Sequence, residues 1–493
     1  MLQLAIETMV VYCGMGIQLT IVVAALCVAC QGSEQVPQPP GKLAGVRVVD
    51  LVPLSLSGET WQDAEPFLAL YDSNPKLMAA SAFTPNPGGS TSATAPIFVS
   101  NDGGDSWTLR NTLPSENMTA DITHAVGANP PVLYAGILKV PGAPLNELKA
   151  NDFLSPATMT LQSSRADIDQ PFVRTAAVAS ADRVYVGLND FDAPDGRTAT
   201  VDVSLDGGAT YRSRRIETRS TLGQNGPSIR PAVARDHTVY VAYFGWRSQT
   251  GSDVTSDVVV VRDDSGATGS APFKDLVDPS DHLPGRLVAT RVTIPWSNAP
   301  TLGQERIGST LSIAVDALHS DTVYVAWADR VGTGDIYTVH LRRSGDRGAT
   351  WSGDRRTVTN ATNASLAVAA NGTVGLLYQQ VTGSGDASRW VTRLERSRDG
   401  FATHQDVVLA DVPATTPAFQ FLPYLGDYNG LLARGDVFLG IFSANNAPDS
   451  ANFPQGVVYQ RRVDFPTHRL LDGSGAAVAV SIDPFFFSVP VLP

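Results

Sequence analysis

An apolar run, a short turn and a second run of the form V-Y-V-A recur along this chain. The first run of each pair is small and almost entirely apolar, whereas the second run mixes apolar and polar positions. A strand that is buried on both faces has a nearly continuous apolar sequence. Each pair therefore predicts an inner strand followed by a more exposed neighbour. The seven first runs contain, in order, Pro66, Ile122, Pro171, Ile229, Leu311, Leu366 and Tyr424.

Most pairs are followed by a third strand-like run and a polar turn, so the repeating unit is a four-stranded antiparallel sheet. Repetition at about 50–60 residues is typical of propeller blades rather than of helical solenoids. We therefore predict an all-β fold, a β-propeller of four-stranded antiparallel blades. Seven blades are favoured by the number of pairs; six are the alternative, with the second unit as an insertion. Residues 46–51 are placed to complete the last blade and remove its open edge.

Three octets of the form S-x-D-x-G-x-(S/T)-aromatic follow third strands, and a fourth, at 397–404, is degenerate. Asp, Ser and Thr side chains bond nearby backbone groups, and Gly supplies the positive φ of a tight connection. The closing aromatic side chain packs between layers. The defining residues are Ser100, Asp102, Gly104 and Trp107; Ser204, Asp206, Gly208 and Tyr211; and Ser344, Asp346, Gly348 and Trp351.

At these octets the chain resembles the Asp-box (BNR-repeat) proteins, of which sialidases are the best-known members and whose fold is a β-propeller. The resemblance implies that each octet is a turn between the third and fourth strands of a blade, on the face away from the ligand. It therefore implies that the octets are structural and not catalytic. The resemblance covers the repeat scaffold across most of the chain.

Composition restricts the classes of partner. The 493 residues carry a formal charge of −12, with 36 Lys and Arg against 48 Asp and Glu. Nucleic acids and anionic membrane surfaces favour clustered basic residues, so neither is expected as the main partner. All three cysteines lie in the first thirty residues, which leaves the body of the chain no thiol for a zinc site or a nucleophile. We expect a glycan or glycoconjugate partner, no cofactor, no metal and a monomer.

The N-terminus has the features of an export segment. An apolar run at 17–30 is followed by a polar stretch and a Pro-rich linker, so residues 1–42 are interpreted as signal and linker and 43–493 as one propeller. The run Ala29-Cys30-Gln-Gly resembles a bacterial lipoprotein cleavage site, with Cys30 as the lipidated residue. Cys27 stands where that pattern usually has Leu, and no basic residue precedes Lys42. Secretion or surface anchoring, in the periplasm or on the cell surface, is the prediction.

The face opposite the octets is the predicted functional face. Because strand direction alternates, the loops before each inner strand and those after each V-Y-V-A strand lie there, around the central channel. Carboxylates transfer protons, arginines bind anionic substituents and aromatic rings stack on sugars. The candidate catalytic residues are Glu65, Asp169, Asp190, Asp329, Asp427 and Tyr428. The candidate substrate-binding residues are Arg230, Arg247, Arg306 and Arg330.

Arg174 and Arg230 lie inside otherwise apolar inner strands, where a charged side chain requires a partner. They line the channel or pair with an inner carboxylate. A single acidic loop residue is more often a solvated or turn residue than a catalytic one, so the prediction depends on convergence of several.

Two functions follow from these residues and the resemblance. Sialidases use an arginine triad, a Tyr nucleophile assisted by a Glu, and an Asp acid/base. The F-R-I-P motif that precedes their first Asp-box is absent, since Glu65-Pro-Phe-Leu stands there. The first prediction is an exported sialidase-like glycoside hydrolase acting on terminal sugars of glycans, with Tyr428 or Tyr424 as nucleophile. The alternative is a non-catalytic propeller that binds glycans or proteins at the cell surface.

Overall fold

The computed structural model describes residues 42–83, 93–94, 96–111, 114–115, 118–128, 130–140, 144–152, 154, 159–178, 181–219, 228–295, 310–331, 337–418 and 424–493. Apart from strands, these residues form three short 3₁₀-helices, η1 (Leu54–Leu56), η5 (Gly385–Ala387) and η6 (Ser450–Asn452). The described part of the chain contains no α-helix. The predicted export segment with Cys30, and the predicted ligand Arg306, lie outside the described residues.

The first four blades are four-stranded and antiparallel, with consecutive strands side by side. Blade 1 consists of β2 (Ala64–Leu70), β3 (Met78–Phe83), β5 (Ile97–Ser100) and β6 (Thr108–Asn111). Blade 2 consists of β8 (Met118–Val126), β9 (Leu133–Val140), β10 (Leu145–Ala150) and β11 (Thr160–Arg165). Blade 3 consists of β12 (Ile168–Ala176), β13 (Arg183–Asp190), β14 (Ala199–Ser204) and β15 (Arg212–Arg215). Blade 4 consists of β16 (Ile229–Val233), β17 (Val239–Thr250), β18 (Asp253–Asp263) and β19 (Arg286–Pro295).

The other three blades repeat this pattern, with a change in the last. Blade 5 consists of β20 (Leu311–Val315), β21 (Val323–Arg330), β22 (Tyr337–Ser344) and β23 (Arg356–Thr359). A single bridge between Thr293 of β19 and Arg330 of β21 joins blade 4 to blade 5. Blade 6 consists of β24 (Ala361–Val368), β25 (Val374–Thr382), β26 (Arg389–Ser397) and β27 (Gln405–Pro413). Blade 7 consists of β28 (Gly430–Arg434), β29 (Val437–Asn445), β33 (Ile482–Pro490) and β1 (Arg47–Asp50).

Small accessory sheets lie outside the blades. β4 (Ala93–Thr94) pairs with β7 (Pro114–Ser115). β30 (Val463–Asp464), β31 (Arg469–Leu471) and β32 (Ala477–Val478) form a three-stranded sheet inserted between β29 and β33.

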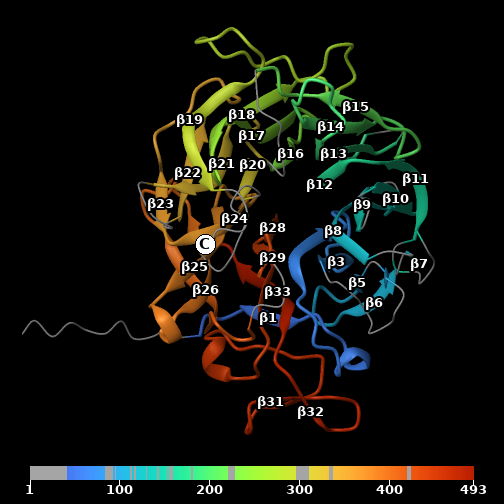
Figure 1. Cartoon of the computed structure of the whole chain (residues 1–493), viewed down its shortest axis with the longest axis vertical. Coiled ribbons are helices and arrows are strands. Elements are labelled where there is room, and N and C mark those ends of the chain that lie inside the picture. Colours follow the sequence, from blue (N-terminus) through green and yellow to red (C-terminus); the bar gives the residue numbers. More distant parts are fainter. Residues whose placement is uncertain are drawn as a thin grey trace, which may run out of the picture. The chain divides into compact units, whose positions relative to one another are not determined.

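The inner strands close a ring. Contacts run in order through β2, β8, β12, β16, β20, β24 and β28, and β28 in turn contacts β2. In Figure 1 the blades follow one another in sequence order, with blue β1 beside red β33. The described residues thus confirm the β-propeller of four-stranded blades and give seven of them. The second unit, for which an insertion was the alternative, is the complete blade 2.

Strand β1 closes the ring as the sequence predicted. It pairs antiparallel with β33 from Arg47 opposite Ser488 to Asp50 opposite Phe485. Gly45 approaches Pro490 so closely that an added Cβ would lie 3.0 Å from the proline ring, and its φ is +80°. A side chain at this position would push the two ends of the chain apart. The last blade is therefore made from both ends of the described chain.

A buried arginine fixes the closing blade to the loop that follows β1. Arg461 Nη1 donates to Glu59 Oε1 at 2.7 Å and to Asp483 Oδ2 at 2.8 Å, and the arginine side chain is fully buried. Its Nη2 donates to the backbone oxygens of Ser57 and Glu59. Burial, Asp483 and Asp63 raise the pKa of Glu59 well above its usual value, and Arg461 opposes them. The arginine is therefore the main compensation for a group of buried acids.

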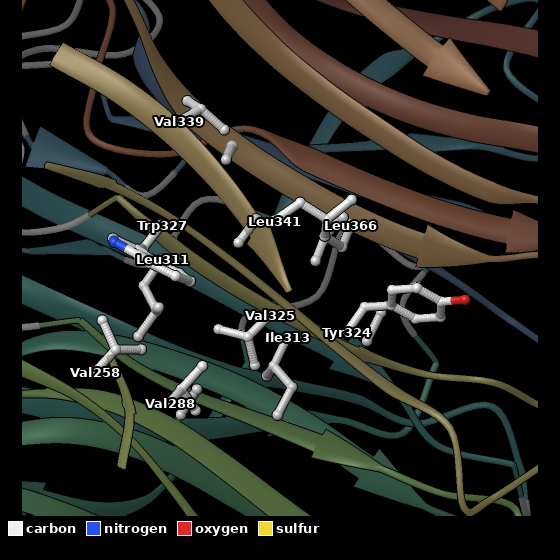
Figure 2. Close-up of a cluster of buried hydrophobic side chains, with 14 of the residues drawn as sticks. Val258, Val288, Leu311, Ile313, Tyr324, Val325, Trp327, Val339, Leu341 and Leu366 are labelled. Atoms are coloured by element: carbon white, nitrogen blue, oxygen red, sulfur yellow. The ribbon is translucent and has the colours of Figure 1, made fainter. Parts of the chain in front are cut away.

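Apolar side chains fill the space between blades. Figure 2 shows Val258 and Val288 of blade 4 facing Leu311, Val325 and other residues of blade 5. Trp327 is 1% exposed in this cluster. Because the inner strands are buried on both faces, they are apolar and small, as their sequence pattern indicated. The blades hold one another through such cores, as in other repeat architectures.

The octets form the predicted turns between third and fourth strands, after β5, β14 and β22. In each, the Ser hydroxyl accepts a hydrogen bond from the Gly backbone N–H at 2.8–2.9 Å, at Gly104, Gly208 and Gly348. The Asp accepts from the backbone and hydroxyl of the Ser or Thr four positions on. The degenerate octet has the same bonds, and Phe401 takes the Gly position with a φ of +70°.

Replacing Asp206 with Ala should lower the free energy of unfolding by about 1–3 kcal/mol, because bonds to Ser204, Ala209 and Thr210 are lost at once. The measurement is urea unfolding followed by tryptophan fluorescence. Asp192→Ala, an exposed acid in another loop of blade 3, is the control and should change little. Equal stabilities of the two variants would contradict a structural role for the octet.

Replacing Arg461 with Met should destabilise the protein by about 3–5 kcal/mol, the usual cost of removing one partner from a buried ion pair. Glu59 and Asp483 then remain buried without their cation. Thermal unfolding measures the loss. Arg462→Met, whose bonds go to the exposed backbone oxygens of Asp472 and Gly473, is the matched control. A loss of stability no greater than that of the control would show that Arg461 does not stabilise the closing blade.

Candidate functional site

A repeated backbone irregularity builds one end of the central channel. The pairing of inner with second strand shifts by one residue, a β-bulge, at the start of β2, β8, β12 and β24. In three of these bulges a polar residue has a positive φ: Glu65 at 52°, Gln170 at 55° and Asn363 at 57°. Non-glycine residues adopt this conformation at a cost, and such strain gathers at functional sites. The bulges turn polar side chains toward the channel end of otherwise apolar strands.

Five charged or polar side chains from four blades surround one another at this end. Arg230 on β16 interacts electrostatically with Tyr428, Asp121, Asp427 and Glu65, which oppose the effect of burial on its pKa. Burial dominates and lowers the pKa of Arg230 to about 10, so the guanidinium is charged at neutral pH. Of the predicted site residues, the structure therefore brings together Glu65, Arg230, Asp427 and Tyr428. We call these residues, with Asp121, the channel cluster.

Hydrogen bonds within the channel cluster orient the tyrosine and one acid. The Tyr428 hydroxyl donates to Asp121 Oδ1 at 3.2 Å, and Gln170 Nε2 donates to Asp427 Oδ2 at 3.4 Å. Burial, followed by Asp121 and Glu65, raises the pKa of Tyr428 well above its usual value. Tyr428 therefore carries its proton at neutral pH. Glu65 and Asp427 are 0% exposed.

The segment that carries Asp427 and Tyr428 is held by blades 1 and 6. The Glu65 backbone N–H donates to Leu425 O at 3.3 Å, and Asn363 Nδ2 donates to Gly426 O at 2.8 Å. Gly426 has a φ of +100°, and an added Cβ would lie 2.1 Å from Glu65 N. Only glycine permits this approach. The close contact fixes Asp427 relative to Glu65.

The remaining predicted residues lie elsewhere. Asp169 precedes Gln170 and accepts a hydrogen bond from the Gln170 backbone N–H at 2.9 Å, so Asp169 borders the channel cluster. Asp190 pairs with Arg165 of blade 2 at 2.5 Å. The structure does not bring Asp190, Arg247, Asp329 and Arg330 to the channel cluster, because each contacts charged or polar residues of the outer strands or blade edges.

Those contacts are specific. Arg247 pairs with Glu217 at 3.1 Å and Asp257 at 2.7 Å. Arg330 pairs with Asp253 at 2.8 Å. Arg247 and Arg330 each lie near the end of a second strand. Sequence order alone does not show which strand lies beside that end.

Asp329 belongs to a second polar group between blades 4 and 5. It accepts from Trp327 Nε1 at 2.8 Å and contacts His340 Nε2 at 3.1 Å. The other ring nitrogen of His340 lies 3.0 Å from Asp354 Oδ2, and the imidazole stacks on Trp327 with centroids 5.0 Å apart. Burial opposes the charged imidazole, but Asp329 and Asp354 outweigh it and raise the pKa of His340.

Two phenylalanines and a histidine of the channel, Phe67, Phe172 and His124, were not predicted as site residues. Phe67, Phe172 and Tyr428 form a small buried cluster, and His124 contacts Phe67 edge to face at 5.3 Å. A signal for this region is the repeat of a polar residue before proline in Glu65-Pro66, Gln170-Pro171 and Arg230-Pro231. An inner strand is an edge strand on the channel side, and edge strands tolerate proline.

Comparisons with known proteins give distant structural similarity. No protein family and no curated protein matches the chain. A protein of unknown function from Dyadobacter fermentans matches 91% of this chain and 100% of its own, with 11% identity and a TM-score of 0.43. A Penicillium chrysogenum α-L-arabinanase complexed with arabinobiose matches 90% and 98%, with 12% identity and a TM-score of 0.41. A PL25 ulvan lyase matches 78% and 92%, with 9% identity and a TM-score of 0.47.

The strand pairing itself establishes the fold, independently of these distant similarities. Among the described residues, no helix has the length and apolar character needed to cross a bilayer. In the same residues, no three His, Cys, Asp or Glu side chains are grouped so that they could hold a metal ion.

The raised pKa of His340 predicts a stability that depends on pH. A folded-state pKa above the unfolded value of about 6.5 stabilises the protein below that pH, and the contribution is lost as pH rises through the folded value. The unfolding free energy should therefore fall above about pH 6.5 in wild type and fall less in His340→Gln. Urea unfolding at pH 6 and pH 9 measures the difference. His237→Gln, at an exposed histidine, should keep the wild-type slope, and the same slope in His340→Gln would contradict the assignment.

Proposed function

We propose that this protein is an exported glycan-acting enzyme of the glycoside hydrolase type, with its site at the channel cluster. The observation that supports this most is the meeting of Glu65, Asp121, Asp427, Arg230 and Tyr428 from four blades at one end of the channel. Paired carboxylates are what glycoside hydrolysis requires, one to donate a proton and one to act as base or nucleophile. The cluster offers three.

The finer proposal is a sialidase-like exo-hydrolase that removes terminal sugars. Arg230 would attract an anionic substituent, and Glu65 and Asp427 would serve as acid and base. Tyr428 would act as nucleophile only after its proton passes to Asp121, its hydrogen-bond acceptor, because burial keeps the hydroxyl protonated. The same bond would let Asp121 return the proton when the glycosyl–tyrosine bond is hydrolysed. The export segment at 1–42 would take the enzyme to glycans outside the cytoplasm.

One observation favours the alternative of a glycan-binding module. Glu65 and Asp427 are 0% exposed, and Tyr428 is 4% exposed. A carboxyl that a sugar cannot reach can orient other groups but cannot protonate a glycosidic oxygen. In a binding module the cluster would set the shape and charge of the channel mouth.

The test is hydrolysis of a panel of fluorogenic glycosides by wild type, Asp427→Asn and Glu65→Gln. For a hydrolase, loss of the true acid or base should reduce turnover about 10²–10⁴-fold while the melting temperature stays near wild type. Asp192→Asn, an exposed acid of blade 3, is the matched control and should remain active. Glycan-array binding is measured in parallel. Binding without hydrolysis would select the module, and neither activity would overturn the proposal.

A further inference from the structure

The central channel contains a small cavity that is lined by two arginines, the buried Arg230 and the half-buried Arg174. We infer that this cavity holds a monovalent inorganic anion of about the size of chloride, bound between Arg174 and Arg230. The anion site goes beyond the proposed glycan chemistry, which concerns the carboxylates at the channel end.

The cavity has room for one small ion. Its volume is about 20 Å³, slightly more than a single water requires. Inner strands of blades 1, 3, 4, 5, 6 and 7 line it. None of the described residues that line it is an Asp or a Glu, while both Arg174 and Arg230 do line it. Such a lining favours an anion, and the cavity is too small for a sugar.

The two guanidiniums lie on the same aromatic ring. The Cζ atom of Arg174 is 4.4 Å from the centroid of Phe172, and that of Arg230 is 4.3 Å from it. Burial lowers the pKa of each to about 10, and for Arg174 the charge of Arg230 adds to the effect. Both therefore remain charged at neutral pH. Two like charges in one narrow channel repel, and a shared anion would relieve that repulsion.

The charges of the two arginines are compensated unequally. Arg230 is near Asp121, Asp427 and Glu65. Arg174 donates Nη1 to Val173 O at 3.0 Å, and within the described ranges it forms no ion pair. Its charge, with burial, lowers the pKa of the neighbouring His124 to about 3, so that imidazole is neutral. Even partial burial of a cation without a counter-ion costs free energy, and a bound anion would supply the counter-charge.

Hydroxyl donors complete the lining. Ser312 and Ser365 also line the cavity. Ser312 Oγ accepts from the backbone N–H of Leu366 at 3.0 Å, which leaves its hydroxyl proton to donate elsewhere. An anion in the cavity would receive hydrogen bonds from the guanidiniums and from these hydroxyls.

The direct test is anomalous diffraction from crystals of the full chain grown in sodium bromide. The expected result is one strong bromide peak in the channel, within contact distance of both guanidiniums. A channel without such a peak would overturn the inference.

The solution test compares melting temperatures in sodium chloride, sodium bromide and sodium gluconate at equal ionic strength. We expect a saturable rise with the two halides and none with gluconate, which is too large for the cavity. Arg174→Met should weaken halide binding at least tenfold, and Arg212→Met, at an exposed arginine of β15, should not. If Arg174→Met does not fold, Ser312→Ala, which removes one donor, should weaken halide binding measurably. Equal halide responses in all variants would contradict the site.

The anion site and the proposed function can fail separately. Asp427→Asn removes a negative charge near Arg230, so it should bind halide at least as tightly as wild type even where hydrolysis is lost. Loss of halide binding in Asp427→Asn would contradict the placement of the anion. Absence of hydrolysis in every variant would leave the bromide result unchanged.

Discussion

The pairing of β1 with β33 is the interaction on which the rest of the structure depends. It joins residues 47–50 to residues 485–488 and completes the fourth strand of blade 7. Each blade packs mainly on its two neighbours. In a closed ring every blade is therefore stabilised by two neighbours, whereas in an open array each end blade is stabilised by only one. An unpaired β33 would also expose a strand of consecutive phenylalanines, Phe485, Phe486 and Phe487, which are all 0% exposed in the closed ring. Arg461 stabilises this joint because it lies between acids from both ends of the described chain, Glu59 and Asp483.

The parts of the fold that could be predicted are the parts fixed locally. The octets specify their own turns through bonds that span at most four residues, and the inner strands are recognisable because burial on both faces requires apolar residues. The run at 46–51 could be assigned to the last blade because a propeller without it has an unpaired edge. The short strands β30, β31 and β32 could not be predicted, since two or three residues carry no periodic pattern and their sheet has no counterpart in the repeat.

The channel cluster was predicted in part for the same reason. Residues at the start of inner strands share a position in the repeat, and this position placed Glu65, Arg230, Asp427 and Tyr428 together. Residues at the end of second strands also share a position, but the side chains there meet the neighbouring outer strand. Asp190 meets Arg165, and Arg247 meets Glu217, through contacts that no local pattern reveals. The contact of the Phe172 ring with Arg230 was missed because the arginine lies on the inner strand of the next blade.

The feature that strains the channel backbone also places its charges. The bulges at Glu65 and Gln170 turn polar groups to one end, where Gly426 allows Asp427 to approach. Arg230, on the regular strand β16, lies among these acids, whereas Arg174 follows the bulge of β12 on the regular part of its strand. An anionic ligand drawn to Arg230 also meets the carboxylates around it, and they repel it unless one of them is protonated. A neutral sugar meets no such barrier at the mouth. In the proposed hydrolase, a protonated carboxyl within reach of a substrate with an anionic substituent would both remove this repulsion and supply the proton that a glycosidic oxygen requires.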